Sequence, residues 1–171
     1  MTDSELREGE VVAAVDPALA AGDARLIFIG TIRTPWPARA DCPRNLREAR
    51  QRAAGPARLE VDPPWRPALA GLAAGMPILV LYWMHEARRD LALQSPKHRD
   101  TPVGTFALRS PVRPNPIALA AVTITAIDAA AGVVAIDAID CVDGTPLLDI
   151  KPYVASVDAP FAPAAPPDAP R

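Results

Sequence analysis

Cysteine, lysine, aromatic residues and long apolar runs are all scarce in this sequence. It contains only two cysteines in 171 residues, and Cys42 and Cys141 lie too far apart to suggest a disulfide framework or a zinc site. No apolar run approaches the roughly 18 residues that a membrane-spanning helix needs. The acidic, polar N-terminus does not resemble a secretory signal. We therefore expect a cytoplasmic protein with no membrane partner.

Several motifs that identify enzyme classes are also missing. There is no glycine-rich GxGxxG turn, so nothing indicates a Rossmann cofactor domain. There is no GxSxG elbow, which argues against a serine hydrolase. His85 and His98 lie in different segments rather than at metal-ligand spacing, so we predict no metal site. No pattern supports a Cys–His nucleophile built on Cys42 or Cys141.

Basic charge is almost entirely arginine and is unevenly distributed. Of the 18 basic residues only Lys97 and Lys151 are lysines. Residues 33–113 hold 14 basic and seven acidic side chains, a balance of +7, whereas residues 1–32 and 114–171 carry −4 and −5. Arginine suits bidentate phosphate contacts and base stacking, and a local basic surface is typical of nucleic-acid binding. A GC-rich coding sequence would produce the same arginine bias, so charge alone leaves RNA binding open.

Short apolar runs alternate with proline-rich segments along the chain. The predicted strands are residues 26–33, 77–85, 103–108, 117–128, 133–139 and 147–150, and the predicted short helices are residues 45–53 and 66–74. Asn45 would cap the first helix, and a tight connection makes the fourth and fifth strands a hairpin. The pattern favours an all-β fold with minor α content: one small β-barrel of about six or seven short strands and a few short helices, not a Rossmann fold.

Composition divides the chain into three parts. Residues 1–25 are predicted to form a flexible acidic lead with at most one short helix. Residues 26–157 hold every predicted barrel strand. Residues 158–171 are a Pro/Ala-rich tail that has little apolar surface to bury.

The run from Arg109 to Ile117 reads Arg-Ser-Pro-Val-Arg-Pro-Asn-Pro-Ile. Each proline fixes its own φ at about −65° and restricts the residue before it, so Asn115 has little backbone freedom. The loop would present Arg109, Arg113 and Asn115 in a preorganised conformation, which lowers the entropic cost of binding a ligand. The alternative is a rigid turn in a proline-rich protein.

The run 140–153 carries three aspartates at predicted strand or loop ends: Asp140, Asp143 and Asp149. Carboxylates at such positions can hold ribose hydroxyls, a cation or a proton in transit. Glycine in the Asp-Gly turn lets a ligand approach the backbone closely. The alternative is an ordinary turn followed by a surface pair between Asp149 and Lys151.

Two further places combine polar or aromatic side chains with strand ends. His85 and Glu86 follow a predicted buried strand, where they could belong to a site or merely cap the strand. Gly30 lies within a strand, which suggests a close backbone approach. Trp36 could stack on a base or, alternatively, fill the core or an interface.

Five of these segments together resemble the TsaA-like family, whose characterised bacterial members are the TrmO-type tRNA methyltransferases. In the family's order, the matching segments are residues 29–35, Pro43-Arg44, the strand that ends in His85, residues 104–117 and residues 143–153. They span about residues 26–157, and their ordered combination is far more specific than any single motif.

The resemblance implies a β-barrel that binds S-adenosylmethionine and works as a homodimer. It implies methylation of N6-threonylcarbamoyladenosine beside the anticodon of tRNA. The implied cofactor-binding residues are Pro43, Arg44, Asn45, His85, Glu86, Arg109, Leu119, Ile139, Asp140, Gly144, Thr145 and Pro146. The residues assigned to catalysis are Arg109, Asn115 and Asp143, and those assigned to RNA binding are Arg33, Arg113 and Lys151.

Two features depart from the family pattern. Ala118 stands where family members often have glycine, and the longer members carry a C-terminal extension where this sequence has its Pro/Ala-rich tail. Two alternatives therefore stay open. The barrel could bind the cofactor and methylate another RNA or a small molecule, or it could be a non-enzymatic binding module. Nothing in the sequence identifies a general base.

Overall fold

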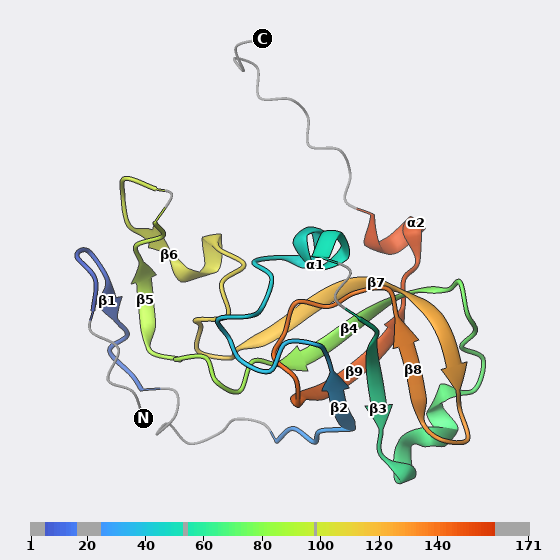
Figure 1. The fold of residues 1–171 in the computed structure, drawn as a ribbon. Coiled ribbons are helices and arrows are strands. Elements are labelled where there is room, and N and C mark those ends of the chain that lie inside the picture. Colours follow the sequence, from blue (N-terminus) through green and yellow to red (C-terminus); the bar gives the residue numbers. More distant parts are fainter. Residues whose placement is uncertain (1–5, 17–24, 53–54, 98, 160–171) are drawn as a thin grey trace.

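Six strands close into a barrel in the computed structural model of the chain (Figure 1). The structure describes residues 6–16, 25–52, 55–97 and 99–159. Around the barrel the strands follow the order β2-β3-β8-β7-β4-β9, and β9 returns to pair with β2. All neighbouring strands are antiparallel. The predicted small β-barrel, as opposed to a Rossmann fold, is confirmed.

The barrel strands are β2 (Gly30–Arg33), β3 (Ala57–Val61), β4 (Pro77–Trp83), β7 (Ile117–Asp128), β8 (Val133–Ile136) and β9 (Thr145–Pro152). A second, three-stranded sheet consists of β1 (Val11–Val12), β5 (Leu91–Gln94) and β6 (Val103–Gly104). The helical segments are α1 (Leu46–Arg52), α2 (Ala155–Asp158) and the 3₁₀ helices η1 (Pro63–Leu69) and η2 (Thr105–Ala107).

Alternating side chains fill the inside of the barrel. In β4, Ile78, Val80 and Tyr82 are buried, whereas the residues between them are half-buried. This period of two follows from the pleat, which sends successive side chains to opposite faces. Leu59 of β3 and Val134 of β8 are fully buried in the same core. Burial of one such aliphatic side chain stabilises the fold by about 1.5–3 kcal/mol, so this core holds the barrel closed.

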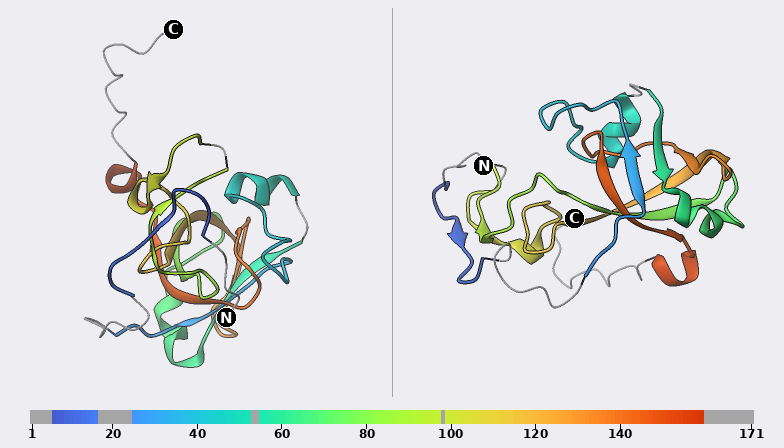
Figure 2. Two further views of the ribbon diagram at one scale, coloured as in Figure 1. Left: turned by 90° about the vertical axis from the view of Figure 1, so that its left-hand side faces the viewer. Right: turned by 90° about the horizontal axis from the view of Figure 1, so that it is seen from below.

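The small sheet stands to one side of the barrel, as the right-hand view of Figure 2 shows. β5 pairs with both β1 and β6. A buried polar cluster fixes its junction with the barrel: Thr105 donates to the Leu91 carbonyl at 2.7 Å, and Gln94 donates to Thr105 at 3.0 Å and to the Val112 carbonyl at 2.7 Å. The sheet is thereby tied to the loop that leads into β7.

Several predicted elements are confirmed with small changes of boundary. β7 spans the predicted run 117–128 and forms the predicted hairpin with β8. Helix α1 occupies most of the predicted range 45–53, and the Asn45 side chain accepts a hydrogen bond from the Glu48 N–H at 3.0 Å, as a helix cap does. Ala53, His98 and residues 160–171 of the predicted tail lie outside the described residues.

Three expectations about elements were wrong. The strand predicted at 103–108 ends at Gly104, because the buried Thr105 hydroxyl bonds to the Leu91 carbonyl and the chain turns into η2. The helix predicted at 66–74 is replaced by η1, which starts at the prolines before it. β3 lies within a segment predicted to be loop and helix. The described part of the lead forms β1 and no helix.

Candidate functional site at one end of the barrel

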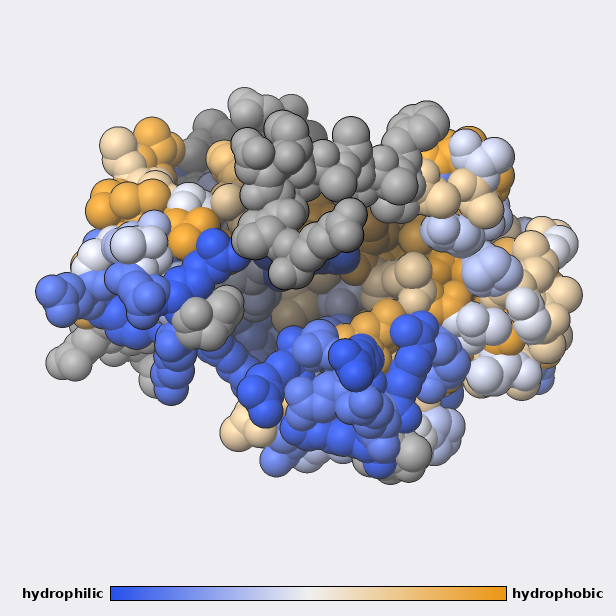
Figure 3. Space-filling model, turned by 90° about the horizontal axis from the view of Figure 1, so that it is seen from above, coloured by the Kyte–Doolittle hydropathy of each residue, from blue (hydrophilic) through white to orange (hydrophobic). Residues whose placement is uncertain are grey.

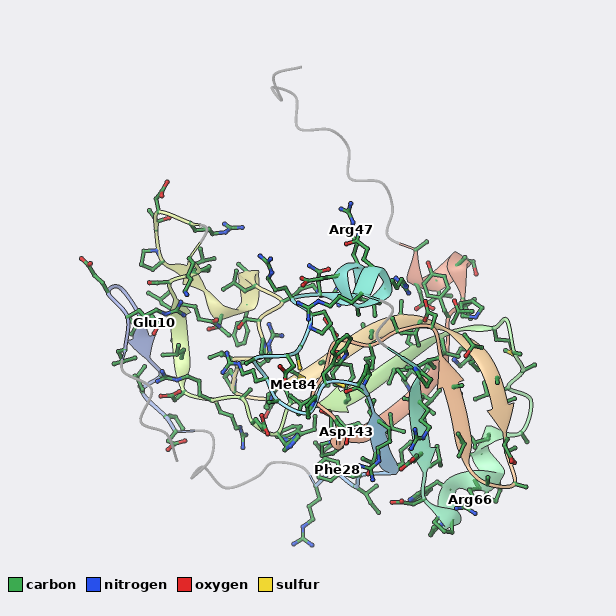
Figure 4. All side chains as sticks on the ribbon, viewed as in Figure 1. Glu10, Phe28, Arg47, Arg66, Met84 and Asp143 are labelled. Atoms are coloured by element: carbon green, nitrogen blue, oxygen red, sulfur yellow. The ribbon has the colours of Figure 1, made fainter. Side chains whose placement is uncertain are left out.

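The predicted site segments converge because the strands that precede or follow them end at the same rim of the barrel. Trp83, the last residue of β4, pairs with Ile117, the first residue of β7. The Met84 N–H donates to the Pro116 carbonyl at 2.8 Å just beyond this pair (Figure 4). Ile32, near the end of β2, pairs with Thr145 at the start of β9. The loops after β2 and β4 and before β7 and β9 therefore share this rim.

Tyr82 and Asp140 form a partly buried polar contact at the rim. The Tyr82 hydroxyl donates to Asp140 Oδ1 at 3.1 Å. Burial, followed by the negative charge of Asp140, raises the pKa of the Tyr82 hydroxyl well above its usual value, while the positive charge of Arg109 acts in the opposite direction. The phenol thus stays protonated and acts as a fixed donor to the carboxylate.

The strand pairing is irregular beside Tyr82. The register between β4 and β9 shifts between Leu81 and Tyr82. Such shifts re-aim side chains and are frequent beside functional sites. Here the irregularity accompanies a tyrosine whose polar tip reaches the loop that precedes β9.

Arg109 joins the proline-rich loop to the rim. Its Nη2 donates to the Leu119 carbonyl at 3.0 Å, while the rest of the side chain is exposed. A guanidinium has five N–H donors, so Arg109 retains donors for an anionic ligand. The structure therefore brings together three of the predicted cofactor-binding residues: Arg109, Leu119 and, through Tyr82, Asp140.

The remaining polar groups of the proline-rich loop mainly hold the loop itself. Arg113 Nε donates to the Ser110 carbonyl at 2.9 Å, and its Nη2 donates to the Leu108 carbonyl. Arg89 donates to the Pro114 carbonyl at 2.6 Å and also lies over the Trp83 ring, 5.5 Å from its centroid. The half-buried Arg113 is thus a clamp within its own loop, and Asn115 is exposed beside it.

The segment that follows β2 is tied to the same rim by Trp36. Trp36 is only 7% exposed, and its indole N–H donates to the Ile139 carbonyl at 3.0 Å. Arg52 of α1 lies over the other side of the ring, 5.6 Å from its centroid. Trp36 therefore packs into the fold, which confirms the second of its two interpretations.

Cys42, next to the predicted residues Pro43 and Arg44, lies close to two carboxylates of the site. Burial, followed by the negative charges of Asp140, Asp41 and Glu86, raises the pKa of its thiol. Because these charges act over short distances, loop 38–45 and Glu86 share one electrostatic environment with Asp140. Pro43 is buried, whereas the Arg44 and Glu86 side chains face solvent.

The turn before β9 is held by the side chains of Asp143 and Thr145 and has open space at Gly144. The Asp143 carboxylate accepts from the Thr34 N–H at 2.9 Å and pairs with Arg33 at 3.5 Å. Gly144 has a φ of +83°, and a Cβ at this position would have no atom within 4 Å. Thr145 is buried and donates to the Val142 carbonyl at 2.7 Å. Space beside Gly144 is therefore accessible to a ligand, whereas Asp143 is engaged in shaping the turn.

Some predicted residues lie elsewhere or play a structural part. Lys151 pairs with Asp149 at 2.7 Å and lies six residues along β9 from Thr145, which is about 20 Å at strand spacing. Arg33 is neutralised by Glu60 at 2.9 Å as well as by Asp143. His85 is exposed, and its backbone N–H donates to the Trp83 carbonyl. Their assigned roles remain predictions.

Two hollows flank the rim. A cavity of about 250 Å³ between α1 and the barrel is lined by Trp36, Arg50, Asp137 and Ile139, among others. A wider groove of about 550 Å³ runs along β2 and β3, where Arg33 and Arg58 share Glu60. Pro146, one of the predicted cofactor-binding residues, is a half-buried residue of β9 that pairs with Thr31 of β2.

The side chains at the rim fit the functional groups of S-adenosylmethionine. Asp140 and Glu86 supply negative charge for its sulfonium, its ammonium or its ribose hydroxyls. Arg109 supplies donors for its carboxylate. The uncrowded position beside Gly144 leaves room for a ligand against the backbone. These two carboxylates and one guanidinium come from three separate loops, and together they are complementary to a zwitterionic, positively charged nucleoside.

Sequence reasoning missed Tyr82. Its neighbours Leu81 and Trp83 make it look like one more core residue of an apolar strand. The available signal is its place near the end of that strand, because a buried phenol usually needs a hydrogen-bond partner.

No group of three or more His, Cys, Asp or Glu side chains is placed to hold a metal ion within the described ranges. In the same part of the chain, no helix has the length and apolar character required to cross a membrane.

Comparison with known proteins identifies relatives along nearly the whole chain. The family model described as the tRNA-methyltransferase O N-terminal domain matches residues 31–159. The probable S-adenosyl-L-methionine-binding protein VirR of Rhizobium radiobacter is 43% identical over 164 residues, which are 95% of this chain and 87% of VirR. A tRNA (adenine(37)-N6)-methyltransferase of Mus musculus is 32% identical over 150 residues, 85% of this chain but only 34% of the mouse protein.

Solved structures give the same result. The crystal structure of TrmO from Pseudomonas aeruginosa superimposes with a TM-score of 0.65 and 32% identity, covering 84% of this chain and 61% of that one. A second TrmO structure gives a TM-score of 0.64 and 33% identity, covering 88% and 66%. The resemblance inferred from the sequence is confirmed: the chain belongs to the tRNA-methyltransferase O family.

Proposed function

We propose that this chain is an S-adenosylmethionine-dependent methyltransferase that modifies adenosine 37 of tRNA, beside the anticodon. We propose further that its substrate is N6-threonylcarbamoyladenosine and that it works in the cytoplasm. The observation that carries the proposal is the convergence at one rim of Asp140, Glu86 and Arg109. Membership of the family supports the reaction class, and relatives named as S-adenosylmethionine-binding proteins support the cofactor.

The rim residues would act mainly by orientation. When bound, S-adenosylmethionine supplies a methyl group on a positively charged sulfur, so alignment with the acceptor contributes much of the rate. Asp140 would lie near the positive charge, held by Tyr82 at 3.1 Å. Arg109 would anchor the carboxylate end through donors not used by Leu119. The acceptor nitrogen forms a bond to the methyl carbon as the carbon–sulfur bond breaks, and its proton leaves to a base that we do not assign.

A second copy of the chain would cover part of this site. Three apolar side chains in the segments directly before and after the proline-rich loop are exposed: Phe106 of η2 is 85% exposed, and Leu119 and Ile117 of β7 are 46% and 39% exposed. Exposed apolar clusters near a binding loop are typical of interaction surfaces. We propose a homodimer, for which light scattering should give twice the 18.1 kDa chain mass. A mass of one chain at micromolar concentration would contradict it.

VirR favours one alternative. The name of VirR refers to the binding of S-adenosylmethionine and not to tRNA. On this reading the barrel binds the cofactor and methylates another RNA or a small molecule, or it transfers no methyl group at all.

A methyl-transfer assay separates these functions. The protein is incubated with labelled S-adenosylmethionine and total tRNA from a strain that lacks its own enzyme, and the tRNA is digested to nucleosides. We expect label in methylated N6-threonylcarbamoyladenosine. Transfer of label to adenosine in tRNA that lacks the threonylcarbamoyl group would contradict that substrate. Saturable cofactor binding with no labelled tRNA would favour the alternative.

A further inference from the structure

Residues 38–52, which comprise α1 and the turn before it, form a strongly basic short stretch of the chain. They contain five arginines and two acidic residues, for a net charge of +3. The chain as a whole has a net charge of −2. Positive charge therefore gathers on this element, within the basic segment recognised from the sequence.

Helix α1 turns two different faces to the barrel and to solvent. Ala49 is buried and Leu46 packs against the core. Arg50 is fixed to the barrel by Asp137 at 2.7 Å and by the Ala121 carbonyl at 3.1 Å. Residues three and four apart share a helix face, so Arg47 and Gln51 lie together on the side of α1 away from these contacts.

Local acids neutralise only part of this charge. Glu48 pairs with Arg44 at 3.4 Å and also with Arg52, whose guanidinium donates to the Asp41 carbonyl as well. Arg39 and Arg47 have no ion pair or side-chain hydrogen bond with any described residue. Arg47 points away from the barrel (Figure 4), and the surface over α1 is the strongly hydrophilic region at the lower centre of Figure 3.

The basic surface is rigidly connected to the rim. Trp36 binds the Ile139 carbonyl on one side and lies under Arg52 on the other. Arg50 and Asp137 hold the helix to the segment that follows β8. Cys42, only two residues before Arg44, lies within the electrostatic reach of Asp140 and Glu86. A polyanion seated on α1 would therefore have a fixed position relative to the cofactor residues.

We infer that Arg39 and Arg47 dock the phosphate backbone of the tRNA whose base enters the rim. The inference rests on the proposed function, because that function supplies the RNA. Guanidinium groups match phosphate oxygens geometrically, and both side chains can bind without first breaking an ion pair with the rest of the described chain. Backbone contacts of this kind set the register of the RNA without reading its sequence. This surface faces solvent beside the site, and it adds to the RNA contacts predicted from the sequence at Arg33, Arg113 and Lys151.

The direct test is tRNA binding at several salt concentrations, measured by fluorescence anisotropy without cofactor. The double variant Arg39→Ala/Arg47→Ala should weaken binding about tenfold near physiological salt. The slope of log affinity against log salt should shrink by about 1.4, at about 0.7 for each lost contact with single-stranded RNA. The Arg39→Lys/Arg47→Lys variant keeps both charges and should recover most of the affinity. Cofactor affinity, measured by calorimetry, should not change in either variant.

Arg25→Ala is the matched control. Arg25 is exposed in the segment that leads into β2, which runs below the barrel in Figure 1, whereas α1 lies above it. This control should bind tRNA like the wild type. If the double variant keeps wild-type affinity and salt slope, or if the wild type binds no tRNA at low salt, the docking surface is overturned. Methyl transfer is measured in the separate labelling assay. A wild type that binds tRNA through α1 but transfers no label would contradict the proposed function and leave the docking surface standing.

Discussion

At the scale of single residues, Tyr82 holds the negatively charged Asp140 side chain in place at the rim. Its hydroxyl lies inside the barrel wall and reaches out to Asp140. A hydrogen bond to a charged group contributes about 1.5–3 kcal/mol, and this one fixes where the carboxylate lies. Tyr82 is therefore a positioning residue that acts on a ligand through Asp140.

Replacing Tyr82 by phenylalanine tests that role. Tyr82→Phe keeps the ring and removes the donor, so we expect the Kd for S-adenosylmethionine to rise about tenfold, which corresponds to roughly 1.4 kcal/mol. Calorimetry measures the Kd directly. The affinity for tRNA should stay at the wild-type value, because Tyr82 does not contact the basic surface. An unchanged cofactor Kd in a folded variant would remove Tyr82 from the site.

The burial of Cys141 should make the stability of the fold depend on pH. Burial raises the pKa of the Cys141 thiol to about 12, while an exposed thiol in the unfolded chain loses its proton near its ordinary pKa of 9.0. The unfolded state therefore releases a proton first as the pH rises, and stability present below pH 9 is lost above it. Raising the pH from 8 to 10 should therefore lower the free energy of unfolding by about 1 kcal/mol through this thiol.

The measurement is denaturant unfolding of wild type and Cys141→Ala at both pH values. The alanine variant will be less stable at each pH, because it leaves a cavity, but its deficit should be smaller at pH 10 than at pH 8. A deficit that does not change with pH would show that the thiol titrates alike in the folded and unfolded chains.

At the scale of elements, the antiparallel pairing of β2 with β3 leaves no room for a side chain at Gly30. A Cβ built on Gly30 would lie 2.0 Å from the Glu60 carbonyl oxygen, which is backbone and cannot rotate away. We expect Gly30→Ala to lower the free energy of unfolding by about 2 kcal/mol or more, since overpacking forces the strands apart. Denaturant unfolding measures this loss.

Gly104→Ala is the control for that substitution. A Cβ on Gly104 meets nothing within 4 Å, and its φ of −56° suits any residue. This variant should lie within about 0.5 kcal/mol of wild type, as surface changes usually do. Equal stabilities of the two alanine variants would contradict the close packing of β2 on β3.

How much of the fold the sequence could predict depends on where each element gets its stability. The β7–β8 hairpin and α1 were predictable, because apolar runs, a tight turn and a capping asparagine are local signals. β3 was missed because its outward residues, Arg58 and Glu60, read as loop, although both are paired in the barrel wall. The short β5 depends on β1 and β6 for its partners, so nothing local could identify it.

The sequence could predict which loops form the site, but not what each side chain in those loops contacts. The ordered motifs placed Arg109, Glu86 and Asp140 near one ligand, and their loops do share a rim. The sequence could not show that Arg113 folds back onto its own loop or that Asp143 is held by Thr34 and Arg33. Those contacts depend on how the closed barrel brings its loops together.

For the whole molecule, barrel closure is what assembles the site. Because β9 returns to β2, the loops from both halves of the chain reach one rim. The small sheet and α1 are then attached beside that rim, the former through Gln94 and the latter through Arg50. A fold of this kind can place a cofactor without the glycine-rich turn of a Rossmann sheet.

The most direct test of this account is a calorimetric titration of S-adenosylmethionine into cofactor-free protein and into Arg109→Ala. The account predicts saturable binding to the wild type and a loss of at least tenfold in affinity for the variant, whose thermal unfolding should show it folded. No binding to the wild type, or equal binding to both proteins, would contradict the claim that the rim of this barrel is the cofactor site.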